Sequence, residues 1–371
     1  MIVFIKLKKL KIFFLVIIII LSCLLGVHLL NNFSKSSTTF ANKDLDTELQ
    51  KIFNTRNQAL LEKNIDILSD LYNKEVRNGL WAYEHELKKM ECLKKWSDRQ
   101  SVQFKRIDSE VILRNSKKKE DGYSVNLLVS TEYEYVYKDD INTSNSFRIG
   151  TYHSLDLIKN KDKYIITREW YTDPFADSLH LDEIESKEIK DIILSGKPKD
   201  LSDLSERRKK AVEYAYKYSG AANLPKYGFQ YNSEYRNYNN EGGDCTNFAS
   251  QVFYEGGDFE KNYTWNYKKG SGSKAWVNAQ AFHNYMIYSG RASIIAEGSY
   301  NEVLKHSYEL LPGDYIAYKK KGKVEHISIV TDIDSKGYSL VNSHNSDRHR
   351  VPWDLGWNNK DIIFHLVRVH Y

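Results

Sequence analysis

Cysteine and proline are scarce in this sequence of 371 residues, which contains 3 cysteines and 5 prolines. One cysteine, Cys23, lies in an apolar N-terminal run, so Cys92 and Cys245 are the two that remain for the rest of the chain. Two cysteines so far apart give no framework of disulfide bonds. We therefore expect the fold to be held by its cores, for which an apolar content of 41% is sufficient.

Several catalytic motifs are also missing. The sequence contains no Cys-x-x-Cys and no pair of histidines four residues apart, which are the usual spacings of zinc sites. It also lacks a glycine-rich phosphate loop and the Gly-x-Ser-x-Gly elbow of serine hydrolases. We expect neither a metal nor a cofactor. The net charge of +5 is mild and spread along the chain, so nucleic-acid binding is not expected.

The first 30 residues have the composition of a signal peptide or a transmembrane anchor. Four lysines precede an apolar run over residues 12–30, in which His28 is the one ionisable side chain. This run is long enough to span a bilayer, and its positive flank predicts a cytoplasmic N-terminus and an exported body. Residues 31–43 follow as a polar linker. We expect an extracytoplasmic protein, either secreted or anchored to the membrane by this segment.

Residues 44–175 are predicted to form a smaller α+β accessory domain. Helical spacing continues to about Trp96, and short alternating or β-branched segments fill residues 101–170. Helices followed by an antiparallel sheet are similar to the cystatin-like or nuclear-transport-factor-like architecture. We see no catalytic constellation here and interpret the domain as a spacer or a binding domain. Residues 176–204, with a predicted short helix at 182–194, form the linker to residues 205–371.

The most informative stretch of the chain is GGDCTNFASQ at residues 242–251. Its two glycines permit a sharp turn, and Asp244 belongs to a residue type that favours the N-cap of a helix. A helix over residues 246–254 would place Cys245 at its N-terminus, where the helix macrodipole favours a thiolate. We therefore predict that Cys245 is a catalytic nucleophile.

A base for Cys245 is predicted about 80 residues further along the chain. A Pro-Gly-Asp turn at 312–314 leads into one strand, and a lysine-rich loop at 319–323 leads to a second strand that begins at His326. A third strand over 338–344 would carry Asn342 and His344 on one face, because side chains alternate along a strand. His326 is the predicted base, and either Asn342 or His344 is predicted to orient its imidazole.

This order of a cysteine on a helix, a histidine on a strand and a polar residue on the next strand resembles the papain-like superfamily. The block GGDCTNFASQ, with residues 211–215, 275–278, the Pro-Gly-Asp turn, His326 and residues 344–348, is similar to the bacterial putative amidase domain family. That family is related to the CHAP cell-wall hydrolases. The resemblance covers about residues 205–371 and implies a papain-like domain with amidase or peptidase activity. It favours His344 as the orienting residue, while Asn342 keeps the position expected for a papain-like third residue.

These features together predict an α+β protein that is an exported, cysteine-dependent amide hydrolase. Export implies a cell-wall target, such as the stem peptides of peptidoglycan. We assign substrate contacts to Asp244 and Trp276, for which helix capping and core packing are the respective alternatives. The alternative function is a non-catalytic wall-binding module with a papain-like shape, and a metal-dependent hydrolase is a weaker one.

Overall fold

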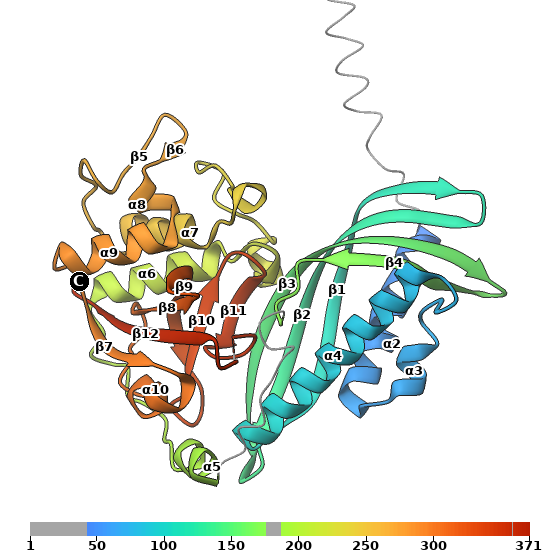
Figure 1. Ribbon diagram of the computed structural model, residues 1–371, viewed down its shortest axis with the longest axis horizontal. Helices are drawn as coiled ribbons and strands as arrows, with labels where there is room; N and C mark the ends of the chain where they lie inside the picture. Colours follow the sequence, from blue (N-terminus) through green and yellow to red (C-terminus); the bar gives the residue numbers. More distant parts are fainter. Residues whose placement is uncertain (1–42, 176–186, 358) are drawn as a thin grey trace, which may run out of the picture. The chain divides into compact units, whose positions relative to one another are not determined.

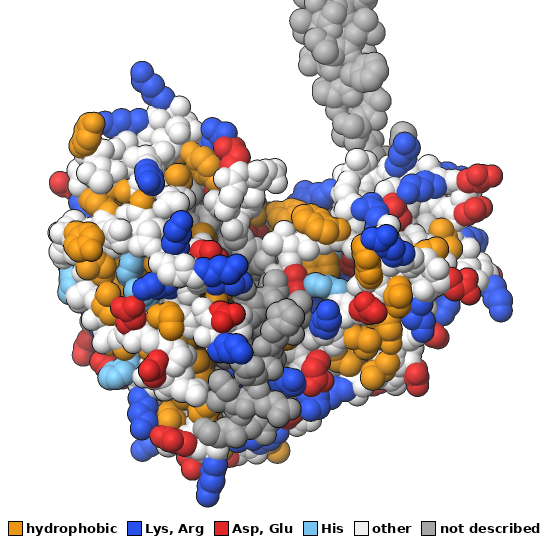
Figure 2. Space-filling view, viewed as in Figure 1, with side chains coloured by type: hydrophobic (Ala, Val, Ile, Leu, Met, Phe, Trp, Pro, Cys, Tyr) orange, Lys and Arg blue, Asp and Glu red, His pale blue; other side chains and the backbone are white. Residues whose placement is uncertain are grey.

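Helices and a large antiparallel sheet make up the fold. The computed structural model describes residues 43–175, 187–357 and 359–371, and Thr47–Tyr371 belong to one compact unit. The predicted leader at 1–30 and nearly all of the linker at 31–43 lie outside the described residues. Among the helices that are described, none is long and apolar enough to cross a membrane. On the face shown in Figure 2, basic and acidic side chains are interspersed over the surface.

The N-terminal half of this unit consists of helices followed by an antiparallel meander (Figure 1). Its elements are α2 (Lys43–Glu62), α3 (Ile65–Ser69), α4 (Arg77–Gln100), β1 (Val102–Lys119), β2 (Gly122–Tyr137), β3 (Asp140–Asn160) and β4 (Lys163–Tyr171). Asn64 caps α3, because its side chain accepts hydrogen bonds from the backbone N–H groups of Asp66 and Ile67. The strands pair in chain order, and tight turns connect them.

The strands of this half are longer than the sequence pattern predicts. Residues 102–104 and 111–113, predicted as separate strands, both belong to β1, which pairs with β2 along its length. The pairing is irregular between Phe104 and Arg106 and again between Leu113 and Asn115. Such irregularities interrupt the alternation of buried and exposed side chains. The prediction of several short strands is therefore wrong, because the interruptions resemble strand ends.

The C-terminal half begins with helices and ends with a run of strands. Its elements are α5 (Lys187–Leu194), α6 (Glu206–Lys217), α7 (Cys245–Gln251), β5 (Tyr267–Lys268), β6 (Ser271–Gly272), α8 (Lys274–Val277), α9 (Ala279–Tyr288), β7 (Ala292–Gly298), α10 (Tyr300–Ser307), β8 (Tyr315–Lys320), β9 (Lys323–Ile333), β10 (Ser339–Ser343), β11 (Asp347–Pro352) and β12 (Ile362–Val369). The Ser205 side chain accepts a hydrogen bond from the backbone N–H of Arg208 and caps α6. A π-helical turn, Val252–Gly256, continues α7. The three strands predicted around His326 are confirmed, although β9 begins at Lys323 and not at His326.

One ten-stranded sheet passes through both halves, in the order β1-β2-β3-β11-β10-β9-β8-β12-β7 with β4 also paired to β3. Strand β11 pairs antiparallel with β3 through Asp347–Gly150, Arg348–Ile149 and His349–Arg148. Strand β4 pairs with residues 153–160 of β3, so β11 and β4 follow one another along the same edge of that strand. The boundary predicted at 176–204 thus separates two halves that share a sheet. That each half folds alone stays a prediction.

Buried polar contacts join the two halves beside this sheet. The carboxylate of Asp354 is fully buried and forms an ion pair with Arg99 of α4. It also accepts hydrogen bonds from Trp96 Nε1 at 3.3 Å and from the hydroxyl of Tyr338 at 2.8 Å. Because each partner of Asp354 is itself buried, the contact depends on both halves being folded together.

The core of the C-terminal half is rich in aromatic side chains. The helices α6, α7, α8 and α9 contribute to one buried cluster that also contains Ile327 and Ile329 of β9. Within it the rings of Phe253 and Phe282 stack, with 6.0 Å between centroids. Packing of this cluster holds α7 against one face of β9, and this arrangement sets the position of the first residue of α7.

Candidate active site

A tight turn precedes α7 and places Cys245 as the first residue of the helix. Gly242 and Gly243 have φ values of 104° and 120°, which side chains with a Cβ rarely adopt. At Gly243 a Cβ atom would also lie 2.1 Å from the side-chain nitrogen of Asn345. The Asn345 Oδ1 atom accepts a hydrogen bond from the backbone N–H of Asp244 at 3.2 Å. The predicted glycine turn is therefore confirmed, and Asn345 is a partner of this turn that the sequence analysis missed.

Asp244 does not cap α7, contrary to the sequence prediction. Its side chain makes no capping hydrogen bond, and its backbone at φ −110° and ψ 0° is not the extended conformation of an N-cap. Oδ1 instead accepts hydrogen bonds from the backbone N–H of Tyr238 and from Asn247 Nδ2, both at 2.9 Å. Oδ2 lies 2.6 Å from His344 Nδ1. Asp244 is thus a buried junction between the preceding loop, α7 and the residue that follows β10.

The thiol of Cys245 is buried, with 5% of the residue exposed. Burial raises the pKa of this thiol, and hydrogen bonds from the backbone N–H of Ile327 and from Thr246 act in the opposite direction. The hydroxyl of Thr246 lies 3.7 Å from Sγ. The lowered pKa expected at a helix start is not found, because desolvation outweighs the donors. The donor at Ile327 places Sγ beside the peptide that joins His326 to Ile327.

The imidazole of His326 points away from the core that contains α7. Its ring lies 5.4 Å from the Tyr318 ring and 4.8 Å from the Trp357 ring, measured between centroids. The next residue, Ile327, belongs to the core, and side chains alternate along a strand. In the described part of the chain, His326 Nε2 has no hydrogen-bond partner. Burial, with the nearby charge of Arg348, lowers the pKa of His326 to about 3, so the ring is neutral near pH 7.

Asn342 and His344 lie on the α6 side of the sheet, and neither has a hydrogen bond or ring contact with His326. Asn342 Nδ2 donates to the hydroxyl of Ser219 at 2.9 Å, and His344 Nε2 donates to the carbonyl of Tyr218 at 2.7 Å. Their shared face was predicted from strand alternation. The same rule puts the His326 side chain on the opposite face of the neighbouring strand. The structure therefore brings Asn342 and His344 to α6 and not to the imidazole of His326.

His344 is held as an imidazolium at the start of α7. Its two nitrogens face the Asp244 carboxylate and the carbonyl of Tyr218, which are both acceptors, so both nitrogens must carry a hydrogen. Desolvation would lower the pKa of His344, but the hydrogen bond and charge of Asp244 outweigh it and raise the pKa. The ring also stacks on Phe248 of α7, with 4.1 Å between centroids. His344 and Asp244 thus form a buried ion pair that positions the helix start.

Trp276, the other residue assigned to substrate binding, lies fully buried on α8. Its Nε1 donates to Asn247 Oδ1 at 2.9 Å, and its ring lies 4.7 Å from the Trp265 ring. Like Asp244, it has its polar atoms engaged inside the protein. In this structure Trp276 therefore packs against α7 and binds its Asn247 side chain.

A cavity of about 880 Å³, which we call the large pocket, lies beside His326. Its lining from the C-terminal half includes His326, Gly243 and Trp357, and its lining from the N-terminal half includes Tyr152 and Trp170. The sequence analysis predicted His326 as the base but no contribution from residues 44–175 beside it. The reason is that the β3–β11 pairing, which brings these segments together, leaves no local signal in the sequence.

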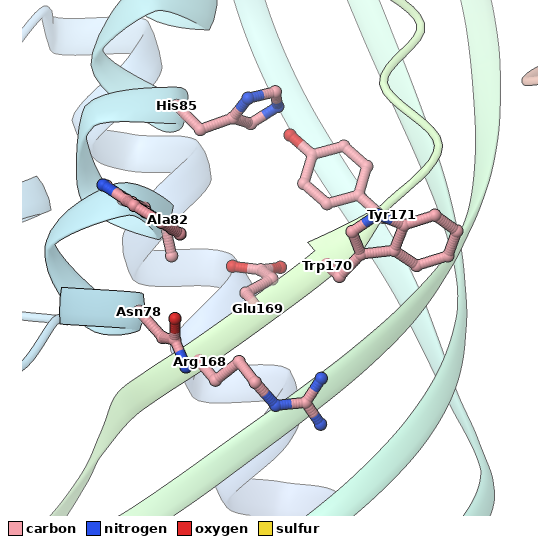
Figure 3. A pocket seen from close by; sticks show the side chains of 8 residues that line it. Asn78, Ala82, His85, Arg168, Glu169, Trp170 and Tyr171 are labelled. Atoms are coloured by element: carbon pink, nitrogen blue, oxygen red, sulfur yellow. The ribbon is translucent and has the colours of Figure 1, made fainter. Parts of the chain in front are cut away.

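A second cavity, of about 480 Å³, opens at strand β4, and we call it the β4 pocket (Figure 3). Figure 3 shows Glu169, Trp170 and Tyr171 in succession on β4, with His85 on the facing helix α4. Trp81 of α4 also lines this cavity. Trp170 belongs to the lining of both the β4 pocket and the large pocket.

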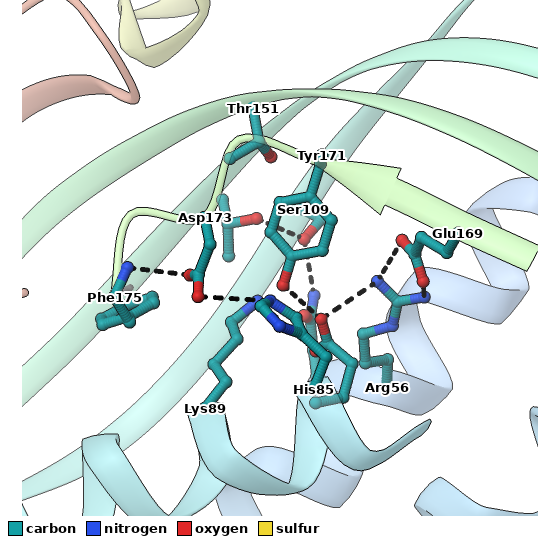
Figure 4. Close-up of polar contacts among 12 residues, drawn as sticks. Arg56, His85, Lys89, Ser109, Thr151, Glu169, Tyr171, Asp173 and Phe175 are labelled. Carbon is teal, nitrogen blue, oxygen red and sulfur yellow. Dashed lines mark hydrogen bonds and ion pairs between the residues drawn. The ribbon is translucent and has the colours of Figure 1, made fainter. Parts of the chain in front are cut away.

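Beside the β4 pocket, charged side chains form a buried network (Figure 4). Arg56 binds both oxygens of Glu169, at 3.0 Å and 2.7 Å, and Lys89 lies 3.5 Å from Glu86. Burial alone would raise the pKa of Glu169, but the charge of Arg56 holds it well below the usual range. This network could not be predicted from the sequence, because charged residues of amphipathic helices normally face solvent. Among the described residues, no group of three or more His, Cys, Asp or Glu side chains is arranged to hold a metal ion.

Comparison with known proteins connects the C-terminal half to a family. Residues 205–367 match the model of the family described as "Putative amidase domain". A search among curated proteins gives no match. A solved structure of Bdellovibrio bacteriovorus Bd1075 aligns with 17% identity over 34% of this chain and 39% of that chain. Its TM-score of 0.21 supports no argument about this fold. The family match confirms the resemblance that rests on GGDCTNFASQ.

Proposed function

We propose, from the premise that residues 205–367 are a domain of the putative amidase family, that the chain is a cysteine-dependent amide hydrolase. The observation that carries this proposal is the position of Cys245. It is the first residue of α7, it lies within the block that carries the family resemblance, and an N–H donor from Ile327 faces its sulfur. The order of Cys245 on a helix and His326 on a strand supports a papain-like domain.

In the proposed reaction, Cys245 Sγ attacks the carbonyl carbon of an amide while its proton passes to His326. His326 then gives this proton to the leaving amine, and water hydrolyses the resulting thioester. A neutral imidazole is required for the first transfer, and His326 is neutral at neutral pH. The burial that lowers its pKa also makes it a weaker base while it stays beside Trp357. The ring must turn from its place beside Trp357 toward Sγ. The adjoining large pocket, which His326 lines, gives room for this movement.

We assign a positioning role to His344. Both of its nitrogens are occupied as donors, so it acts through Asp244 and the start of α7, not as a proton acceptor. Asn342 is bound to Ser219 of the loop after α6, and we assign it to anchoring β10. A backbone N–H at the start of α7 supplies one donor to the oxyanion that forms during attack.

The place of action and the substrate follow from the leader and the family. The lysine-flanked apolar run at 12–30 supports export, with the body of the protein outside the cytoplasm. A cell-wall peptide or amide bond, as in peptidoglycan, is the proposed substrate. The helices and meander at 44–175 support an accessory domain of cystatin-like or nuclear-transport-factor-like type.

The test is a search for an acyl-enzyme. Purified peptidoglycan is incubated with the wild-type protein and with Cys245→Ala, and both the released ends and the protein are analysed by mass spectrometry. We expect new amine ends and an adduct on the peptide that contains Cys245, both absent from the variant. A chelator should leave release unchanged. Wall binding without release would instead support the non-catalytic module, and release that is lost with a chelator and restored by zinc would support a metal enzyme.

A further inference from the structure

Two exposed tryptophans line the β4 pocket. Trp81 is 52% exposed and Trp170 is 64% exposed, whereas Trp265, Trp276 and Trp353 are fully buried. Tryptophan is highly buried on average, so two exposed indoles at one cavity call for an explanation. The guanidinium of Arg77 lies 4.1 Å from the centroid of the Trp81 ring, which covers part of that indole and restrains it.

Two charged residues that line the β4 pocket, Glu169 and Arg168, have partners of opposite charge, and His85 lies beside a carboxylate. Glu169 is bound by Arg56, as described above. The Nε atom of Arg168 lies 2.7 Å from Asp156, and His85 lies 3.3 Å from Asp173. A charged ligand would find no uncompensated group of opposite sign among these residues. The pocket is therefore suited to a ligand without net charge.

The remaining lining groups suit a ligand with many hydroxyl groups. A sugar ring has an apolar face of C–H groups, which packs on an indole, and an edge of hydroxyl groups, which need donors and acceptors. The pocket offers both, because the exposed amide of Asn78 and the imidazole of His85 lie in the same lining as the indoles. We propose that the β4 pocket binds a neutral oligosaccharide, with sugar rings packed on Trp81 and Trp170.

Trp170 lines both pockets, and this indicates the direction in which a bound oligosaccharide extends. Because Trp170 also lines the large pocket, an oligosaccharide on this residue continues into the cavity that holds His326. Tyr152, which is 43% exposed and lines the large pocket, extends the aromatic surface along β3. The proposal rests on the lining of the two cavities and stands without the chemistry at Cys245. If that chemistry holds, the enzyme takes a substrate whose amide is attached to a glycan.

Binding is tested with the full-length protein carrying Cys245→Ala, which cannot turn over a substrate. Tetra-N-acetylchitotetraose and cellotetraose are titrated by calorimetry, with a capped tetra-alanine peptide as a neutral polypeptide probe. Trp81→Ala and Trp170→Ala should each weaken sugar binding by about three- to tenfold. Trp170→Phe should restore part of the loss. Tyr263→Ala, which removes an aromatic ring that is 98% exposed and lines neither pocket, serves as the matched control and should not change binding.

Chemical protection gives a second measurement that needs no tryptophan variant. N-bromosuccinimide oxidises exposed indoles, and bound sugar should slow oxidation of Trp81 and Trp170 in peptide mass maps. The proposal would be overturned if neither sugar gave a binding heat and neither protected Trp81 and Trp170 from oxidation. It would also be overturned if both tryptophan-to-alanine variants bound the sugars as tightly as the protein with both tryptophans. Binding of the peptide but not of the sugars would overturn it in favour of a polypeptide partner. Sugar protection without an acyl-enzyme at Cys245 would overturn the proposed hydrolysis alone.

Discussion

The two halves of the chain bury different kinds of side chain. The N-terminal half buries Arg56 with Glu169, and Lys89 with Glu86, between its helices and its sheet. The C-terminal half buries an aromatic cluster around Trp276. Removing one partner of a buried ion pair leaves an uncompensated charge, whereas trimming an aromatic core leaves a cavity. The first interior depends on complete pairing, and the second depends on filled volume.

The two halves also differ in the surroundings of their titratable side chains. Around the β4 pocket, Glu169 and Arg168 each pair with a group of opposite sign, and His85 Nε2, which has no hydrogen-bond partner among the described residues, lies 3.3 Å from the carboxylate of Asp173. In the C-terminal half, His326 Nε2 is also buried without a hydrogen-bond partner among them, and the charge that acts on it is that of Arg348. Such groups are uncommon in folded proteins, and a catalytic role is one of the recognised explanations. The surroundings of His326 support the proposal that the reaction takes place in the C-terminal half.

The largest effect should come from replacing a cysteine by alanine, and each half contains one cysteine for the comparison. Cys245→Ala should lower kcat/KM for amide hydrolysis by about 10⁴-fold or more, since it removes the proposed nucleophile. Cys92→Ala is the matched control. Burial raises the pKa of the Cys92 thiol to about 12, so this residue is an inert part of α4. Full activity of Cys245→Ala would contradict the cysteine mechanism. Loss of activity in Cys92→Ala at unchanged stability would contradict the assignment of the nucleophile to the C-terminal half.

The next largest effect should come from breaking the ion network of the N-terminal half. Arg56→Met leaves Glu169 buried without its arginine, with His153 and the Tyr72 hydroxyl still beside it, and should lower the free energy of unfolding by about 3–5 kcal/mol. Arg106→Met is the control, because Arg106 also contacts carboxylates, including Glu134 at 2.9 Å, but its side chain is 50% exposed. Its loss should change the free energy by roughly 0–1 kcal/mol. Urea unfolding of both variants measures the difference, and equal costs would show that burial does not matter here.

A smaller effect concerns the pH dependence of the Asp244–His344 pair. Asp244 raises the pKa of His344 in the folded protein, so the pair stabilises the fold fully below the unfolded pKa of about 6.5. This contribution is lost as the pH rises through the higher folded pKa. The stability gap between wild type and Asp244→Asn should therefore narrow as the pH is raised from 6 to 9. Glu309→Gln, which removes an exposed partner of His306, is the surface control and should change the free energy of unfolding by no more than about 1 kcal/mol.

In this experiment Asp347 titrates near the same range, because burial raises its pKa to about 6. The charge of Asp244 also acts on Asp347, so the comparison is made with Asp347→Asn in both proteins, which removes this titration. A gap that is constant or widens with pH would contradict the raised pKa of His344.

The smallest effect should come from a hydrogen bond that links the halves at the large pocket. The hydroxyl of Tyr152 on β3 hydrogen-bonds to Tyr231, whose own hydroxyl donates to Asp347. Tyr152→Phe should lower the free energy of unfolding by about 0.5–1.5 kcal/mol, the usual net value of one hydrogen bond. Tyr263→Phe is the surface control, with no expected change. A Tyr152→Phe protein as stable as wild type would mean that this bond adds nothing to the joint between the halves.

Local features of the fold were predictable from the sequence, and features that depend on distant residues were not. The cap at Ser205, the glycine turn before Cys245 and the strand order around His326 each follow from a few neighbouring residues. The opposite orientation of His326 and Asn342 could not be predicted. It depends on the register of two strands, and the pairing of β9 with β10 contains an irregularity between Leu340 and Val341.

Burial of charge was equally hidden from the sequence. Arg56, Glu86 and Glu169 lie on three different elements, and each looks like an ordinary surface residue in its own segment. Asp244 shows the same limit in the candidate site. Its residue type favours a helix cap, yet its partner His344 lies 100 residues away and changes its role. Pairing between distant segments decided each of these cases.

The joint between β3 and β11 also has a consequence for the time at which the sheet is completed during synthesis. Residues 148–150 leave the ribosome nearly 200 residues before their partners at 347–349. At 5–20 residues per second, this delay is roughly 10–40 s. For that time the edge of β3 presents unpaired N–H and C=O groups, which other chains can bind as they would any open strand. Arg148 carries a charge on this edge, and charged residues are a common defence against such pairing. The order of synthesis therefore makes the β10–β11 hairpin the element that covers this edge, and β12 is added between β8 and β7 after it.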